Sequence, residues 1–211
     1  MTNKEHRAVA LASMLLGLSL LASPVRAQDK VAAVDDTAKK VAASVCVSCH
    51  GAAGVGTSPV FPRLAGQSEI YLAAQLRAFK TKVRGEKDAH DYMWGMATLL
   101  EDPVIDALAR YYAAQKPAPG IAGAAALVAR GKAVFEKGDP VQEIMACSSC
   151  HGPLAEGNGI FPRLAGQRSA YVVRQLDAIQ TRTRASPVMH GVIKEMDPGT
   201  MKAVAEYVQS L

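Results

Sequence analysis

The sequence has few aromatic residues, few cysteines and no long tract of basic residues. Aromatic side chains make up 5% of the 211 residues, which is little for packing two ordinary domains, so another apolar group is expected in the interior. Four cysteines are too few for a disulfide-stabilised scaffold. The absence of a lysine or arginine tract argues against nucleic-acid binding. With 49% hydrophobic and 20% charged residues, the chain is expected to fold.

The first 27 residues have the pattern of a secretory signal peptide. Lys4 and Arg7 precede an uncharged run from Ala8 to Val25, and Val25-Arg26-Ala27 offers a cleavage site before Gln28. We therefore expect export, with cleavage near Ala27. An uncleaved membrane anchor is the alternative, although serines and a proline dilute a run that is already short for a membrane span.

The remaining chain contains one pattern twice. Phe61–Gln67 reads Phe-Pro-Arg-Leu-Ala-Gly-Gln and recurs letter for letter at Phe161–Gln167. Further matches keep the same order along the chain: Cys46–His50 with Cys147–His151, Tyr71, Gln75 and Leu76 with Tyr171, Gln175 and Leu176, Met93–Gly95 with Met189–Gly191, and Asp102-Pro103 with Asp197-Pro198. Such repetition indicates two homologous units. Because Lys116–Gly120 is a stiff, helix-breaking segment, we expect domains at 28–117 and 121–211, joined by the linker 118–120.

Each copy is expected to be all-α. A helix capped by Asp36 is expected to lead into the first cysteine motif, and 124–136 is its counterpart. A second helix is expected after each Gly-Gln pair, because apolar residues then recur at helical spacing. Asp102-Pro103 and Asp197-Pro198 each combine a capping aspartate with a first-turn proline, which predicts a final helix in each copy. No alternating strand pattern of useful length occurs.

All four cysteines belong to two Cys-x-x-Cys-His motifs, which are typical of covalent attachment of c-type haem. Two thiols three positions apart can each add to one vinyl group of a porphyrin, and the next residue can then supply the proximal nitrogen to iron. The candidate residues are Cys46, Cys49 and His50 in the first motif, and Cys147, Cys150 and His151 in the second. Three alternatives are a zinc site shared between the halves, a redox dithiol, and plain disulfides. A redox dithiol is expected beside a βαβ pattern that is absent, and disulfides need no following histidine.

A haem iron also needs a sixth ligand, for which methionine is the first candidate. Met93 and Met189 share the pattern Met-x-Gly at matching positions, so the repeat selects them. Three other methionines follow the motifs without a methionine partner in the other copy and are expected to be packing residues: Met96, Met196 and Met201. His90 and His190 lie close by without matching each other, and they leave bis-histidine ligation as an alternative.

Other residues have a possible supporting role. In Pro62-x-Leu64-x-Gly66 and its counterpart at 162–166, a backbone carbonyl can accept the second ring proton of the histidine and orient it; a simple proline turn is the alternative. Four repeated side chains are candidates for hydrogen bonds to haem propionates, or else ordinary core and surface residues: Tyr71, Tyr171, Arg63 and Arg163. Four neighbouring basic residues form either a solvated face or a docking patch for an acidic partner: Lys80, Lys82, Arg84 and Lys87.

Together, the two Cys-x-x-Cys-His motifs, the repeated Phe-Pro-x-Leu-Ala-Gly-Gln, the following Tyr-x-x-x-Gln-Leu and Met-x-Gly before the last helix resemble the dihaem cytochrome c4 family. The resemblance covers nearly all of the mature chain. It implies two tandem class I cytochrome c domains, each wrapped around one covalently attached haem c. The implied ligand sets are Cys46, Cys49, His50 and Met93 for one haem, and Cys147, Cys150, His151 and Met189 for the other.

The resemblance also implies a role. A cytochrome of this kind would be a periplasmic electron carrier and not an enzyme, passing single electrons between a quinol-oxidising complex or dehydrogenase and a terminal oxidase. Its partners would be redox proteins, with at most peripheral membrane association. A dihaem subunit of a periplasmic dehydrogenase complex, with a flavoprotein or quinoprotein partner, would have the same fold and ligands and is the alternative. An enzyme with an open or cysteine-ligated iron is disfavoured, because no fifth cysteine exists and both copies keep a methionine.

Overall fold

The computed structural model describes residues 24–211, with side chains from Gln28 onward. It divides into two units, residues 1–33 and 34–211, and the second unit holds both repeats. Of the first unit only the beginning of a helix is described, so the signal peptide expected at 1–27 lies almost entirely outside the described residues. None of the helices within the described range is long and apolar enough to cross a membrane.

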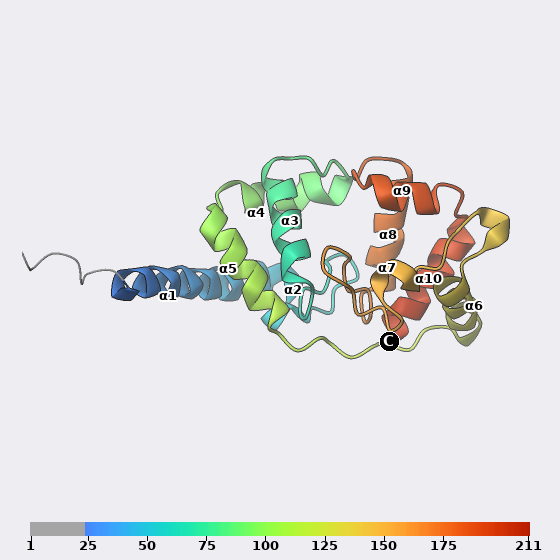
Figure 1. The fold of residues 1–211 in the computed structure, drawn as a ribbon, viewed down its shortest axis with the longest axis horizontal. Coiled ribbons are helices and arrows are strands. Elements are labelled where there is room, and N and C mark those ends of the chain that lie inside the picture. The colour runs from blue at the N-terminus through green and yellow to red at the C-terminus, as the bar shows by residue number, and fades with distance from the viewer. Residues whose placement is uncertain (1–23) are drawn as a thin grey trace, which may run out of the picture. The chain divides into compact units, whose positions relative to one another are not determined.

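Between residues 24 and 211 the regular structure is helical and contains no β-strand, which confirms the all-α prediction (Figure 1). The α-helices of this range are α1 (Pro24–Val41), α2 (Val47–His50), α3 (Glu69–Lys80), α4 (Trp94–Thr98), α5 (Asp102–Ala113), α6 (Ala125–Lys137), α7 (Ser148–His151), α8 (Ser169–Gln180), α9 (Pro187–Ile193) and α10 (Pro198–Ser210). Two π-helical segments (Ala42–Cys46 and Ala89–Met93) and two 3₁₀ turns (Ala52–Gly54 and Pro140–Gln142) complete them.

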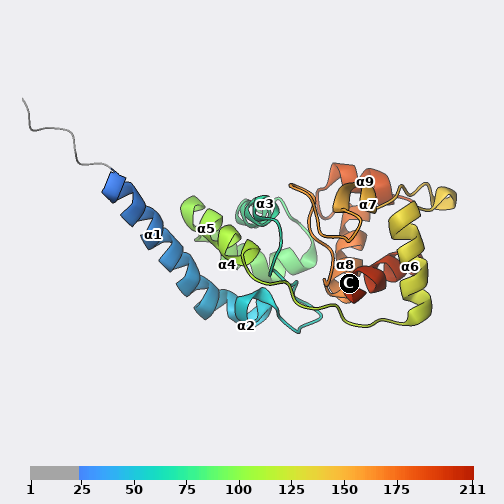
Figure 2. The same ribbon diagram turned by 60° about the horizontal axis from the view of Figure 1, so that its bottom comes forward.

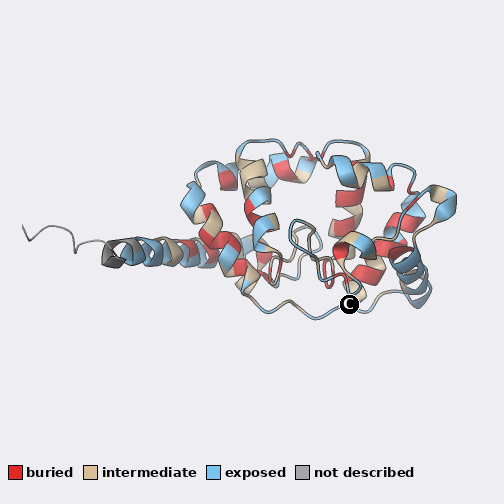
Figure 3. Ribbon diagram, viewed as in Figure 1, coloured by how far each residue is buried: buried red, intermediate tan, exposed pale blue. Residues whose placement is uncertain are grey.

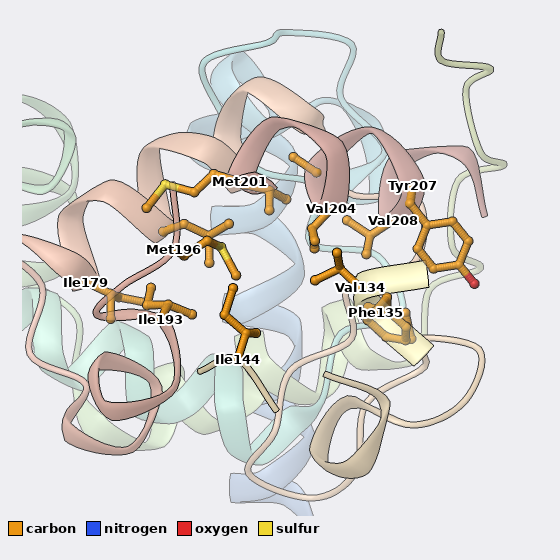
Figure 4. Packing of buried hydrophobic residues seen from close by; sticks show 14 of the residues in the cluster. Val134, Phe135, Ile144, Ile179, Ile193, Met196, Met201, Val204, Tyr207 and Val208 are labelled. Atoms are coloured by element: carbon orange, nitrogen blue, oxygen red, sulfur yellow. The ribbon is translucent and has the colours of Figure 1, made fainter. Parts of the chain in front are cut away.

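Each half has its own hydrophobic core. In the N-terminal half α3 packs against α5, and Leu72, Ile105 and Leu108 are buried there. In the C-terminal half α10 packs against both α6 and α8, around the fully buried Phe135 and Val208 (Figure 4). Buried residues are prominent on α5, α8 and α10 (Figure 3). Two separate cores joined by an irregular segment after α5 are what two tandem domains require.

The helix starts correct two capping predictions. Asp36 caps nothing, because α1 is already helical from Pro24 and Asp36 lies inside it. Asp197 does cap α10, and its side chain accepts a hydrogen bond from the Thr200 backbone N–H at 2.8 Å. Asp102 instead accepts a bond from the Lys80 ammonium at 3.1 Å, and the residue before α5 is Glu101, whose side chain makes no capping bond. Asp102 is therefore the first residue of α5, whereas its sequence counterpart Asp197 is the N-cap of α10, one position earlier.

In both copies of Cys-x-x-Cys-His, the four residues after the first cysteine form a short helix that ends at the histidine. In the N-terminal half α1 continues through the π-helical segment 42–46 directly into α2, whereas in the C-terminal half a loop separates α6 from α7. The residue after each histidine is a glycine with positive φ, 74° at Gly51 and 83° at Gly152. Other residues adopt this conformation only with strain, so glycine lets the chain leave the helix immediately after the histidine.

Candidate functional site

His50 and His151 have equivalent surroundings. Both rings are buried, and Nδ1 of each donates a hydrogen bond of 2.9 Å to a proline carbonyl, from His50 to Pro62 and from His151 to Pro162. Burial lowers the pKa of both histidines and the carbonyl bond partly opposes it, so both rings favour the neutral form with the proton on Nδ1. This confirms the predicted carbonyl partner. Nε2 is then the nitrogen left to bind a metal, and in His151 this atom is buried without a hydrogen-bond partner.

The four cysteines are partly buried, and none of them forms a disulfide. Burial raises the pKa of the Cys46 thiol, and it raises that of the Cys147 thiol to about 11. Among residues 24–211 no group of three or more His, Cys, Asp or Glu side chains is arranged to hold a metal ion. The shared zinc site considered from the sequence therefore lacks a ligand cluster.

The histidines and cysteines line a cavity of about 550 Å³ that extends through both halves. Its walls are mostly apolar, with the same types of donor atom contributed by each half. The lining includes Cys46, Cys49, His50, Leu64 and Met93 from the first half, and Cys147, Cys150, His151, Leu164 and Met189 from the second. Thiols, a free imidazole nitrogen and a thioether sulfur around an apolar space are the donor set that a covalently attached, six-coordinate haem needs. The residues present therefore fit two such groups.

Met93 and Met189 hold equivalent places relative to the final helices. Met93 ends the π-helical segment before α4, and Met189 lies in α9. Each precedes the N-cap residue of the final helix by eight positions, since these N-caps are Glu101 and Asp197. The helices therefore keep the same register as the Met-x-Gly pattern. The equal spacing to the N-caps is a structural observation, separate from the Met-x-Gly sequence match on which the two methionines were chosen.

The other methionines differ in position. Met96 lines the cavity, although its side chain is exposed. Met196 and Met201 are buried in the C-terminal core, with Ile144 and Ile193 in the same cluster (Figure 4). Met196 also lines the cavity, whereas Met201 does not. Their burial in the core agrees with the packing role expected from the sequence.

Neither competing histidine lines the cavity. His90 is exposed, bonds to its neighbour Asp91 and stacks edge-on against Trp94 at a centroid distance of 4.9 Å. Nδ1 of His190 lies 3.2 Å from the Ile179 carbonyl oxygen, and its Nε2 accepts from Arg182 at 3.1 Å. Both rings thus have other partners.

A buried polar cluster joins the two halves beside the cavity. Arg84 and Arg184 are 5% and 9% exposed, and both donate to the side-chain oxygens of Gln75 and Gln175 at 2.6–3.0 Å. Arg84 also forms a salt bridge with the buried Glu86. Two guanidinium groups against one carboxylate leave net positive charge beside the cavity, which suits the carboxylate side chains of a haem.

This cluster corrects the proposed basic surface. Arg84 is buried, so it belongs to neither a solvated face nor a docking patch. Lys80 bonds to Asp102 and Lys87 to Asp91, while Lys82 lies over the Trp94 ring at 5.5 Å. The sequence contained a signal for the cluster, since Arg84 and Arg184 are separated by the same 100 positions as Phe61 and Phe161, but charge patterning alone does not reveal burial.

Arg63 and Tyr71, from the repeated arginines and tyrosines, have specific partners. The Arg63 guanidinium donates to the carbonyl oxygens of Pro119 and Gly166 at 2.9 and 2.8 Å, so it holds the linker and the opposite half. The Tyr71 hydroxyl accepts a bond from Arg184 at 2.7 Å. Tyr71, Tyr171, Arg63 and Arg163 all line the cavity.

Known proteins identify this arrangement. The cytochrome c family pattern matches the chain twice, at residues 36–113 and 128–211. Cytochrome c-552 of Acidithiobacillus ferridurans is 39% identical over 215 residues, covering 100% of this chain and 93% of that protein. The solved structure of cytochrome c4 from Acidithiobacillus ferrooxidans matches with a TM-score of 0.75 and 41% identity, covering 79% of this chain and 98% of its own. This chain belongs to the dihaem cytochrome c4 family.

Membership in the cytochrome c4 family settles the cofactor and the class of activity. The chain consists of two tandem cytochrome c domains, each of which covalently binds one haem c. It is an electron carrier and not an enzyme, and its partners are redox proteins. One further relative is a thiosulfate dehydrogenase electron acceptor of Thiomonas intermedia, which is 41% identical over 79% of this chain and 78% of its own length.

Proposed function

We propose that Cys46, Cys49, His50 and Met93 hold one haem, and that Cys147, Cys150, His151 and Met189 hold the other. The observation that carries this assignment is the pair of 2.9 Å bonds from the histidine Nδ1 atoms to the proline carbonyls. These bonds fix the ring tautomer, so that Nε2 is the metal-binding nitrogen in a cavity shared with the thiols and the methionine. When bound, each haem supplies an iron that exchanges one electron between its ferric and ferrous states.

The ligand assignment is tested on exported protein with haem attached. We expect two haems per chain by mass and absorbance, and a long-wavelength sulfur-to-iron band in the ferric spectrum. Met93→Ala and Met189→Ala should each remove about half of this band, because one of the two thioether ligands is lost. Met96→Ala and Met201→Ala are the matched controls and should keep it. Loss of the band in Met96→Ala, with the band retained in Met93→Ala, would reassign the N-terminal ligand.

As a carrier, the protein is proposed to act in the periplasm, after cleavage near Ala27, with domains at 28–117 and 121–211 joined by the linker 118–120. It would take single electrons from a quinol-oxidising complex or a dehydrogenase and deliver them to a terminal oxidase. With a histidine and a methionine from the protein as ligands, each iron would keep no coordination position for a substrate, which supports transfer rather than catalysis. Stopped-flow mixing with a quinol-oxidising complex, and separately with a terminal oxidase, should show haem reduction and oxidation; failure in both reactions would refute this role.

The second candidate is a dihaem subunit of a periplasmic dehydrogenase complex. The similarity to the thiosulfate dehydrogenase electron acceptor of Thiomonas intermedia favours it. The two roles differ in their assembly, because a subunit remains bound to its dehydrogenase whereas a free carrier dissociates. Mild solubilisation and size-exclusion chromatography from the native cell should elute a free carrier at the mass of one or two chains. Elution together with a dehydrogenase would favour the subunit.

A further inference from the structure

The two halves contact each other through a reciprocal pair of glutamines. The Gln167 side chain accepts a hydrogen bond from the Arg63 N–H at 2.9 Å and donates to the Arg63 carbonyl at 3.0 Å. In the mirrored contact, Gln67 accepts from the Arg163 N–H at 2.7 Å and donates to the Arg163 carbonyl at 2.9 Å. Both glutamines are 7% exposed, so these bonds are shielded from water. Each half thus binds the backbone of the other half at one equivalent residue.

The peptide groups involved are those that hold the histidines. The Pro62 carbonyl and the Arg63 N–H belong to the same peptide unit, and so do the Pro162 carbonyl and the Arg163 N–H. One end of each unit accepts the histidine Nδ1 proton, and the other end donates to the glutamine of the opposite half. His50 is thereby linked to Gln167, and His151 to Gln67, through two hydrogen bonds and one amide.

We propose that Gln67 and Gln167 are positioning residues that set the electron donation of the histidine in the opposite half, and with it the reduction potential of the opposite haem. The proposal rests on the proposed function, in which His50 and His151 bind iron. A peptide whose N–H donates a hydrogen bond becomes more polarised, so its carbonyl accepts more strongly. A stronger acceptor at Nδ1 makes the imidazole a better donor to iron. Better donation favours the ferric state, so each glutamine lowers the potential of the opposite haem.

The location of the glutamines gives the proposal a crossed signature. Gln67→Met and Gln167→Met keep the length and neutral charge of the side chain and remove both bonds to the opposite half. They also remove the bond that each Oε1 accepts from the next backbone N–H, that of Ser68 or Arg168. Gln67→Met should raise the potential of the C-terminal haem and leave the N-terminal haem unchanged, and Gln167→Met should do the reverse. The measurement is an NMR redox titration of the two-haem protein, in which the haem methyl signals are assigned to their domains. The haem in the same half as the substitution is an internal reference.

Two further variants separate tuning from docking. Ser68→Ala removes another contact between the halves, the bond from the Ser68 hydroxyl to the Gly159 carbonyl at 2.5 Å. It also removes the α3 capping bond from the Tyr71 N–H, and it leaves both histidine-bound peptides untouched. It should shift neither potential. Gln67→Glu keeps an acceptor oxygen for the Arg163 N–H, so the potential of the C-terminal haem should be no higher than in the unmodified protein. If Gln67→Met fails to take up haem, Gln67→Glu provides the test in its place.

The outcomes are distinguishable from failure of the proposed function. If the unmodified protein does not show the spectrum of two haems, the proposed binding of iron by His50 and His151 is refuted. With both haems intact, a shift confined to the opposite haem supports the proposal. Equal shifts at both haems, a shift at the haem of the same half, no shift in either methionine variant, or a raised C-terminal potential in Gln67→Glu would each overturn it.

Discussion

The crossing of α6 and α10 leaves no space for a side chain at Gly131, which makes this position a test of the packing. The two helices pack directly against each other (Figure 2). A Cβ atom on Gly131 would lie 2.0 Å from the carbonyl oxygen of Ala203 and 2.5 Å from its carbonyl carbon. Both atoms belong to the backbone of α10, and Ala203 is fully buried, so the helices must separate to admit even a methyl group.

Gly131→Ala should therefore destabilise the C-terminal half. Overpacking a core typically costs about 1–3 kcal/mol, and a clash with backbone belongs at the upper end because no rotamer change relieves it. Alanine gains about 1 kcal/mol over glycine in helix propensity, so the net loss is about 2 kcal/mol. For a domain of this size each kcal/mol shifts Tm by roughly 4–8 °C, so we expect a decrease of about 8–16 °C.

The measurement is thermal unfolding of the two-haem protein, followed by circular dichroism and by haem absorbance. Gly191→Ala is the matched control in the same half, because a Cβ at Gly191 meets no atom within 4 Å. This helical and exposed site should gain stability or stay unchanged. If Gly131→Ala melts at or above the temperature of the unmodified protein, the close approach of the two helices is wrong.

Three further perturbations test separate contacts. Asp197→Ala should lower Tm at neutral pH, because hydrogen bonds from Thr200 hold the Asp197 pKa below its ordinary 3.8. The stabilisation by Asp197 is complete above pH 3.8 and is lost as the pH falls through the lower pKa of the folded state. In strong acid the Tm difference between the variant and the unmodified protein should vanish. Phe135→Ala, at a fully buried site, should cost about 3–5 kcal/mol in urea unfolding, and a loss below about 1 kcal/mol would contradict the core assignment. Arg84→Met removes the salt-bridge partner of buried Glu86 and should cost about 3–5 kcal/mol. Adding Glu86→Leu should restore part of this loss, since the bonds from Arg84 to Gln75 and Gln175 stay broken, and strictly additive losses would contradict this pairing.

The sequence alone could predict those site residues whose type and spacing are both defined by one motif. Cys-x-x-Cys-His fixes the spacing of two thiols and a histidine, so each motif was predicted to serve one haem, and the structure places these side chains around one cavity. The proline carbonyl was also predictable, because the chain returns to the histidine after about a dozen residues in both copies. The methionines needed the repeat, since the sequence offers several and only comparison between the halves selects two of them.

Other features depend on tertiary contacts that one sequence does not display. Arg84 looked like a surface residue because lysines surround it, yet it is buried against Glu86 and the glutamines of both halves. Asp102 looked like a helix cap because Asp197 is one, but α5 begins one residue earlier relative to the shared letters, and Lys80 takes its carboxylate. Local propensity predicts the same capping role for Asp102 and Asp197, and only tertiary packing makes the two residues differ.

The glutamines show why a repeat is informative without being sufficient. Gln67 and Gln167 were visible as identical letters, but their partners are backbone groups in the other copy, which no residue pattern identifies. The repeated heptapeptide therefore has two roles: its proline carbonyl holds the histidine of its own half, and its glutamine holds the corresponding peptide of the other. In an isolated half, water would replace the glutamine and the peptide would lose its shielded partner. Duplication has thus produced two halves that complete each other, so contact between the domains is part of the environment of both proposed haem ligands.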